Sequence, residues 1–163
     1  MNPRPDFAFV AGHPAHFVAF GFGAGLAPIA PGTAGTLAAL PAYWLMKPHY
    51  SDLEFFALIV ACFVLGVWAC GRTGRALGVA DHGGMVWDEI VAFWLVLLVV
   101  PDELTWQAAA FVLFRVFDIA KPQPIRYFDA SLTGGFGVMF DDVLAAFYAL
   151  LVLAFAKFII AGA

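Results

Sequence analysis

The sequence predicts an all-α, multi-pass membrane helical bundle of about four to five helices, some of them short or re-entrant. Hydrophobic residues make up 63% of the 163 positions and charged residues only 12%, whereas a soluble domain averages about 25% charged residues. The apolar runs are too long for strands and do not alternate with polar residues. We therefore expect one membrane-embedded domain over residues 1–163.

Five apolar stretches, separated by glycine and proline, are the expected helices. The second stretch is the strongest, because it approaches the roughly 20 residues that a membrane-spanning helix needs. The five ranges are 34–46, 53–71, 85–100, 106–120 and 138–160. Residues 1–20 lack the basic start and apolar core of a secretory signal, and we expect them to form a segment at the membrane periphery.

The basic residues predict an orientation in the membrane. If each stretch crosses once, and the loop before Thr36 starts on the cytoplasmic side, loops 71–85 and 119–138 lie on that side as well. These two loops hold four basic residues, as the positive-inside rule requires. The four are Arg72, Arg75, Lys121 and Arg126. The same topology brings acidic residues from distant segments to one membrane face, where they can share a site.

Five acidic residues at helix ends are candidate metal ligands. They are Asp88, Glu89, Asp118, Asp141 and Asp142. Charges inside membrane helices cost about 2.5–3.5 kcal/mol each, so they usually have a function. Compensation of helix dipoles is the structural alternative, but it does not fit Asp118, which lies at a C-terminal end between Arg115 and Lys121. Clustered carboxylates repel unless a cation lies among them, and oxygen ligands favour Mg²⁺ or Mn²⁺.

Two further segments are less specific. The run 21–36 combines glycines with Thr33 near a helix start, and such a turn can cradle a phosphate. A simple hinge into the membrane would have a similar sequence. His13 and His16 are three residues apart, but no acidic residue or cysteine accompanies them, so we interpret them as a surface pair. A net charge of -4 without a basic stripe argues against nucleic acid as a partner.

Four ordered segments resemble a known family. They read GFGAGLAPIAPGTAGTLAALP, DHGGMVWDEIVAFW, FRVFDIAKPQPIRYFD and GGFGVMFDDVLA. Together they are similar to the phosphatidylglycerophosphatase A family of bacterial membrane phosphatases, with Gln123 as a small departure. The resemblance implies Mg²⁺-dependent removal of the terminal phosphate of phosphatidylglycerophosphate, giving phosphatidylglycerol. It also implies a phospholipid as substrate and a site on the cytoplasmic face of the bacterial inner membrane.

We hypothesise a mechanism that assigns a role to each of the candidate site residues. The five acids named above are the expected Mg²⁺ ligands, and Asp88 is also a candidate catalytic residue. Asp81 is expected to position or deprotonate the attacking water, and Thr33 to bind a phosphate oxygen or act as a nucleophile. The residues expected to bind the substrate are Thr33, Arg115, Lys121 and Arg126.

Two functions from other classes are alternatives. An ion-coupled membrane transporter would place charges near the bilayer midplane, within inverted repeats, whereas the acids here collect at helix ends. A non-catalytic membrane scaffold would need no acidic cluster, so its function would survive the loss of several acids.

Overall fold

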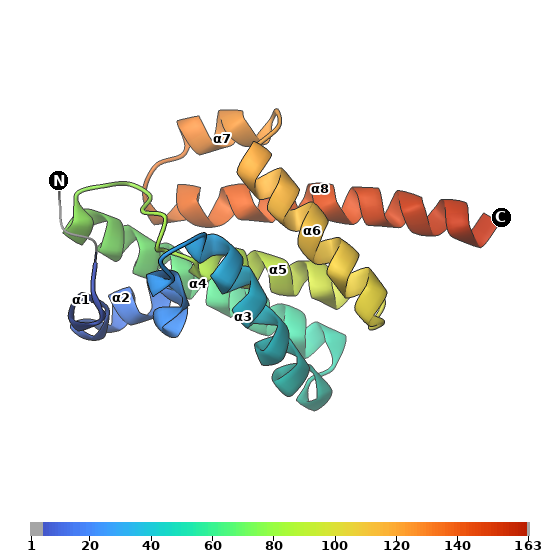
Figure 1. Ribbon diagram of the computed structural model, residues 1–163, viewed down its shortest axis with the longest axis horizontal. Helices are drawn as coiled ribbons and strands as arrows, with labels where there is room; N and C mark the ends of the chain where they lie inside the picture. The colour runs from blue at the N-terminus through green and yellow to red at the C-terminus, as the bar shows by residue number, and fades with distance from the viewer. Residues whose placement is uncertain (1–4, 163) are drawn as a thin grey trace.

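The computed structural model describes residues 5–162, and all regular secondary structure in this part of the chain is helical, as expected, with loops between the helices (Figure 1). The five long helices are α3 (Pro31–Met46), α4 (Asp52–Leu77), α5 (Trp87–Val99), α6 (Leu104–Ala120) and α8 (Gly134–Gly162). The short elements are α1 (Phe7–Ala11), α2 (Pro14–Ala19), η1 (Gly21–Leu26), η2 (Lys47–His49) and α7 (Ile125–Ser131). The expected domain 1–163 and segment 1–20 include residues 1–4 and 163, which lie outside the described residues.

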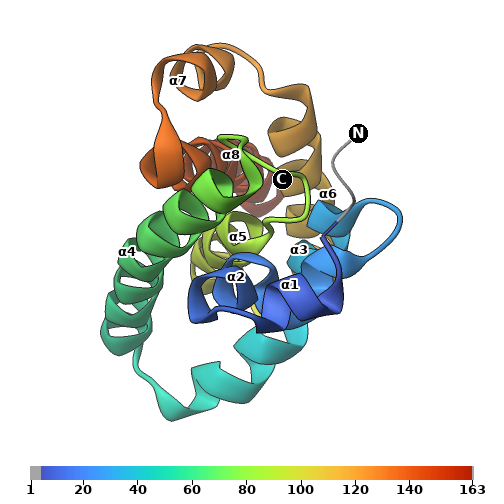
Figure 2. The same cartoon turned by 90° about the vertical axis from the view of Figure 1, so that its left-hand side faces the viewer.

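Helix α5 occupies the middle of the bundle. Figure 2 shows α3, α4, α6 and α8 around it, and nine of its 13 residues are buried. Phe93 stacks on Phe114 of α6 with ring centroids 5.5 Å apart, and Trp94 Nε1 donates to the carbonyl of Ala39 in α3 at 2.9 Å. A helix that is apolar on nearly all sides is a core helix. The chain therefore surrounds α5 with the other long helices.

The long helices alternate in direction. The N-terminal ends of α3, α5 and α8 lie at the same end of the bundle as the C-terminal ends of α4 and α6 (Figure 1). At this end Gly135 packs so closely on α4 that an added Cβ would collide with the carbonyl of Val67. At the opposite end Tyr43 Oη donates to the carbonyl of Leu97 at 3.1 Å. Acidic residues that are far apart in the sequence thus meet at one end.

The expected start of α3, end of α4 and start of α8 were each wrong by three residues or more. Helix α4 begins in a capping box formed by Ser51 and Glu54, and it continues beyond residue 71 to Leu77, where Gly78 with φ of 71° ends it. Gly78 can adopt this left-handed conformation without a steric penalty. Helix α8 begins at Gly134 rather than at residue 138. Gly71 and Gly135, which indicated loops at these places, lie inside helices, where they permit close contact between α4 and α8.

The N-terminal elements pack against the bundle and correct one interpretation. His16 in α2 is only 8% exposed, and its Nδ1 forms a hydrogen bond with Thr73 Oγ1 in α4 at 2.9 Å. Its ring also stacks on Phe9, with centroids 4.4 Å apart. The surface pair expected for His13 and His16 was therefore wrong, since His16 is a buried residue that joins α2 to α4.

Two of the described helices are long and apolar enough to cross a membrane, namely α4 and residues Gly134–Ala161 of α8. Helix α5 has 13 residues and is about 20 Å long, which is less than the roughly 30 Å of a hydrocarbon core. Two of the segments expected to span the membrane thus have the necessary length, and α5 is too short to do so upright.

Candidate active site

Three acidic side chains from two helices meet at the end of the bundle described above. Asp88 and Glu89 lie in the first turn of α5, and Asp142 lies near the start of α8. Each residue offers an oxygen atom, and these oxygens all lie within 4.8 Å of one another. Asp88 and Asp142 are only 6% and 3% exposed. We refer to Asp88, Glu89 and Asp142 as the carboxylate cluster.

Backbone contacts hold the start of α5 in place. The amide of Val86, which precedes the helix, donates to the carbonyl of Ala19 at the end of α2, at 2.8 Å. The amide of Met85 donates to the carbonyl of His82 at 2.7 Å and closes the turn that leads into α5. The first residues of α5 therefore have a defined position, and Asp88 and Glu89 start from a fixed backbone.

The carboxylate cluster has more acceptor atoms than partners. Within the described part of the chain, Oδ1 of Asp88, Oε2 of Glu89 and Oδ2 of Asp142 are buried and accept no hydrogen bond. Burial of ionised carboxylates is costly unless they are paired or bind a metal. The N-terminus of α5 offers only partial compensation. This set of oxygen donors fits a hard divalent cation such as Mg²⁺.

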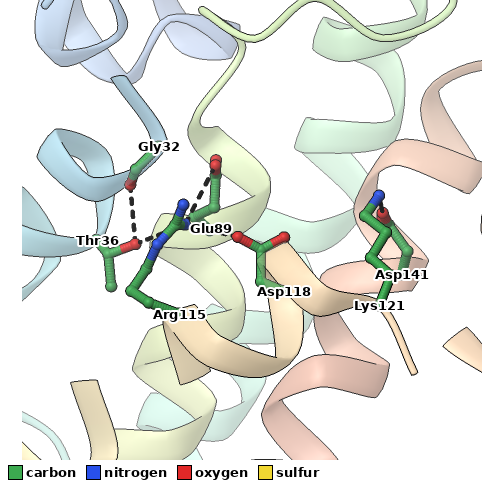
Figure 3. A network of polar contacts seen from close by, with 7 residues as sticks. All are labelled: Gly32, Thr36, Glu89, Arg115, Asp118, Lys121 and Asp141. Carbon is green, nitrogen blue, oxygen red and sulfur yellow. Dashed lines mark hydrogen bonds and ion pairs between the residues drawn. The ribbon is translucent and has the colours of Figure 1, made fainter. Parts of the chain in front are cut away.

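Arg115 of α6 is the cation in contact with this cluster (Figure 3). Its Nη1 lies 3.5 Å from Oε1 of Glu89 and 2.7 Å from Oδ2 of Asp118. The same nitrogen donates to Thr36 Oγ1 at 3.3 Å. The side chain of Arg115 is 13% exposed and its Nε has no partner among the described residues. One guanidinium group thus links α3, α5 and α6, while its buried Nε has no partner in the described structure.

Gly32 and Thr36 are site residues that the sequence reasoning missed. Thr36 Oγ1 donates to the carbonyl of Gly32 at 2.9 Å and is thereby oriented to accept from Arg115. A Cβ added at Gly32 would collide with Oε1 of Glu89 and with the guanidinium of Arg115. A signal was present, because a helix that starts at Pro31 places residues 32 and 36 on the same face.

A second group of charges lies beside the carboxylate cluster. Lys121, which ends α6 with φ of 41°, pairs through Nζ with Asp129 at 2.7 Å and with Asp141. Burial by itself lowers the pKa of Lys121, but the hydrogen bonds that its Nζ donates to Asp129 and Asp141 outweigh this effect and raise the pKa above its usual value. Lys121 is therefore a cation at neutral pH. We refer to Lys121, Asp129 and Asp141 as the Lys121 cluster.

The remaining predicted residues lie at different distances from these groups. Thr33 is half-buried and lines a groove together with Arg115, although Thr36 is the threonine bonded to Arg115. Asp81 is exposed in the loop before α5, and Arg126 is exposed on α7. The structure thus brings Asp88, Glu89 and Asp142 together, with Arg115 and Asp118 beside them. It places Lys121 and Asp141 in the neighbouring cluster.

Comparison with known proteins gives consistent results. Residues 17–157 match the family model of phosphatidylglycerophosphatase A. The phosphatidylglycerophosphatase A of Escherichia coli is 44% identical over 135 residues, which cover 82% of this chain and 77% of that protein. The phosphatidylglycerophosphatase A of Haemophilus influenzae is 48% identical over 154 residues and 93% of each chain.

A third relative bears a different name. A protein of Bacteroides thetaiotaomicron, provisionally named a phosphatidylinositol-3-phosphatase, is 41% identical over 165 residues, which cover 96% of this chain and 98% of that protein. No solved structure shows a significant match to the chain.

Proposed function

Because the chain belongs to the phosphatidylglycerophosphatase A family and is a phosphatase, we propose that it hydrolyses the terminal phosphate monoester of phosphatidylglycerophosphate in a Mg²⁺-dependent reaction. The observation that carries the proposal is the carboxylate cluster, whose three oxygens lie within 4.8 Å of one another. Two relatives of high identity carry the name of this activity. A lipid substrate also agrees with the apolar surface of the bundle.

Asp88, Glu89 and Asp142 are the residues that would hold Mg²⁺. When bound, the ion would neutralise phosphate oxygens and stabilise the charge that develops in the transition state. Asp118 and Asp141 were also expected to be ligands, but each lies against a cation of the chain, Arg115 and Lys121 respectively. We therefore assign to Asp118 and Asp141 the positioning of these two cations.

The chain's own residues supply the contacts that hydrolysis needs. In this reaction a water oxygen bonds to phosphorus, the bond to the glycerol oxygen breaks, and that oxygen takes up a proton. Arg115 has a buried Nε without a partner in the described structure, and this group can donate to a phosphate oxygen. Lys121 adds a positive charge beside the cluster. Asp81 remains the proposed residue for the water, and Thr33 a proposed phosphate contact.

We further propose that the chain is a multi-pass protein of the bacterial inner membrane, with the site on the cytoplasmic face. Helices α4 and α8 have the necessary length and composition. Large apolar side chains are also exposed on the outer faces of the long helices, among them Leu45, Val64, Val112 and Phe155. Such a surface is typical of contact with lipid. Arg72 and Arg75 lie at the same end of the bundle as the site, in agreement with the positive-inside rule.

The decisive experiment measures release of inorganic phosphate from phosphatidylglycerophosphate in detergent micelles. We expect release in Mg²⁺, loss of release in EDTA and recovery when Mg²⁺ is restored. Phosphatidylinositol-3-phosphate, suggested by the name of the third relative, serves as the competing substrate. The control is Asp142→Asn, purified as a folded protein with the same elution volume as the wild type.

Each outcome has a defined meaning. Folded wild-type protein that releases no phosphate from phosphatidylglycerophosphate in Mg²⁺ would contradict the substrate, and preference for the inositol lipid would reassign it. Release that continues unchanged in EDTA would contradict the metal dependence. Full activity of Asp142→Asn would exclude this residue as an essential ligand.

A further inference from the structure

A groove between α3 and α6 opens on the outer surface of the bundle. It has a volume of about 470 Å³, and its walls include Phe111, Val112, Val116 and Ile119 of α6. Of all its described lining residues only Thr33 and Arg115 are polar. Figure 2 shows α3 and α6 on the same side of the central helix α5. We call this feature the α3–α6 groove.

The inner end of the groove is part of the candidate active site. Arg115 lines the groove and also contacts Glu89, Asp118 and Thr36. Gly32 lies at the same place, because a Cβ there would collide with Glu89 and Arg115. A molecule in the groove would therefore have its polar end within reach of the guanidinium that contacts the carboxylate cluster. The groove and the site form one continuous surface.

The outer end of the groove is apolar and open. Val112, Val116 and Ile119 are 58%, 52% and 72% exposed, and their spacing places them in one stripe along α6. This stripe is about 10 Å long, given a rise of 1.5 Å per residue. A groove with a cationic end and an apolar wall is complementary to a molecule with a phosphate at one end and a hydrocarbon chain at the other.

A second groove provides a comparison within the same molecule. It lies between α4 and α8 and has a smaller volume of about 320 Å³, with Val60, Phe63, Phe136 and Phe140 among its lining residues. All of its described lining residues are apolar. The described lining of this α4–α8 groove has no polar or charged side chain that could bind a phosphate, so we interpret it as a surface in contact with lipid chains. Of these two grooves in the described part of the chain, the α3–α6 groove alone combines an apolar wall with access to the site.

We propose that the α3–α6 groove receives an acyl chain of the phospholipid substrate, which enters the site sideways from the bilayer between α3 and α6. This inference rests on the proposed function and adds to it the route and the binding surface of the lipid. The phosphate end lies toward Arg115 and Thr33, and the first part of the chain lies along Val112 and Val116.

The test compares a lipid with a phosphate ester that has no acyl chain. Val116→Trp fills the α3–α6 groove, and the matched control Val60→Trp places the same side chain in the α4–α8 groove. The measured quantity is the ratio of kcat/KM for long-chain phosphatidylglycerophosphate to kcat/KM for glycerol phosphate. We expect Val116→Trp to lower this ratio about tenfold, because binding energy from the acyl chain is lost. Val60→Trp should leave the ratio unchanged.

A second measurement does not depend on turnover. A phosphatidylglycerophosphate with a photoreactive acyl chain should label peptides of α6 more than peptides of α4, and Val116→Trp should reduce the labelling of α6. An unchanged ratio together with labelling of α4 instead of α6 would overturn the proposal. Val116→Trp that turns an oligomer into a monomer without changing the ratio would also overturn it, since a second copy would then fill the groove. Absence of phosphate release from every lipid by wild-type protein would instead refute the proposed function.

Discussion

Two groups of acidic side chains lie at the same end of the bundle, and they differ in how their charges are balanced. In the Lys121 cluster, Asp129 and Asp141 share one lysine, which contacts both of them. In the carboxylate cluster, the nearest cation is Arg115, which lies 3.5 Å from Glu89 and closer to Asp118. Both acids of the first group thus have a cation at ion-pair distance, although Oδ1 of Asp141 is buried without a partner, whereas Asp88 and Asp142 have no ion pair in the described structure.

The difference separates acids that serve the structure from acids that would serve the reaction. A buried carboxylate that lacks partners makes folding less favourable, and the chain contains two such residues side by side with Glu89. A function that supplies a cation would compensate for this cost. An ion pair such as Lys121 with Asp129 needs no such explanation, because the positive charge is already present.

The largest expected effect is on activity, in Asp142→Asn. The amide has nearly the same shape but no charge, and we expect kcat/KM for phosphatidylglycerophosphate to fall on the order of 10²–10³-fold, as for loss of one preorganised electrostatic contact. Phosphate release in Mg²⁺ measures this. Activity within a factor of about two of wild type would show that the unpaired charge of Asp142 has no catalytic purpose.

The second expected effect is stabilisation by metal. A ligand at 100 times its Kd stabilises the folded state by about 2.7 kcal/mol, so Mg²⁺ should raise the midpoint of thermal unfolding of the wild type. In Asp142→Asn the rise should be much smaller, because a ligand is lost. The measurement is thermal unfolding in detergent with EDTA and with excess Mg²⁺, and Ca²⁺ serves as a comparison cation. If Mg²⁺ raised the unfolding midpoint equally in the wild type and the variant, Asp142 would not be a ligand of the ion.

The third prediction contrasts two adjacent residues of α8. Asp141→Asn removes a partner of Lys121 and should lower stability in EDTA by about 1–3 kcal/mol, the usual cost of a lost bond to a charged group. Asp142→Asn removes an unpaired acid from the carboxylate cluster and should not lower stability under the same conditions. Denaturation of both variants in EDTA checks the pair. Equal losses of stability in the two variants would contradict the proposed difference between the Lys121 cluster and the carboxylate cluster.

The smallest effect is expected in Asp129→Asn. The side chain of Asp129 is 42% exposed, and ion pairs at such positions contribute at most about 1 kcal/mol. Lys121 also keeps its contact with Asp141 in this variant. The free energy of unfolding and the rate of phosphate release should therefore stay close to those of the wild type. A large loss of activity would show that Asp129 takes part in the active site.

The sequence predicted much of the fold because hydrophobic segments and their breaks follow from composition. The five long helices and the gathering of acids at one end could be read from apolar runs and loop charges. The limits of α4 and α8 could not be predicted, because Gly71 and Gly135 resemble loop residues until the helix that packs against each of them is known. The short helices α1, α2 and α7 carry too few residues for a periodic signal.

The sequence predicted which residues belong to the candidate site, but it did not predict which side chains contact one another there. The sequence identified five acids as one set, and only three-dimensional contacts separate Asp118 and Asp141, which lie against cations, from the carboxylate cluster. Thr33 was singled out, whereas Thr36 makes the hydrogen bond with Arg115. The choice between them depends on the start of α3 at Pro31, three residues before the expected start.

Under the proposed function, the position of Asp142 within α8 would set the depth in the membrane at which hydrolysis takes place. The 20 residues from Val143 to Gly162 extend about 30 Å, which equals the thickness of a hydrocarbon core. Lys157 is the one charged residue in this stretch, and its long stem allows the ammonium to reach the far interface. With this stretch immersed, Asp142 lies where acyl chains give way to headgroups, so a phospholipid would be cleaved without being lifted out of its leaflet.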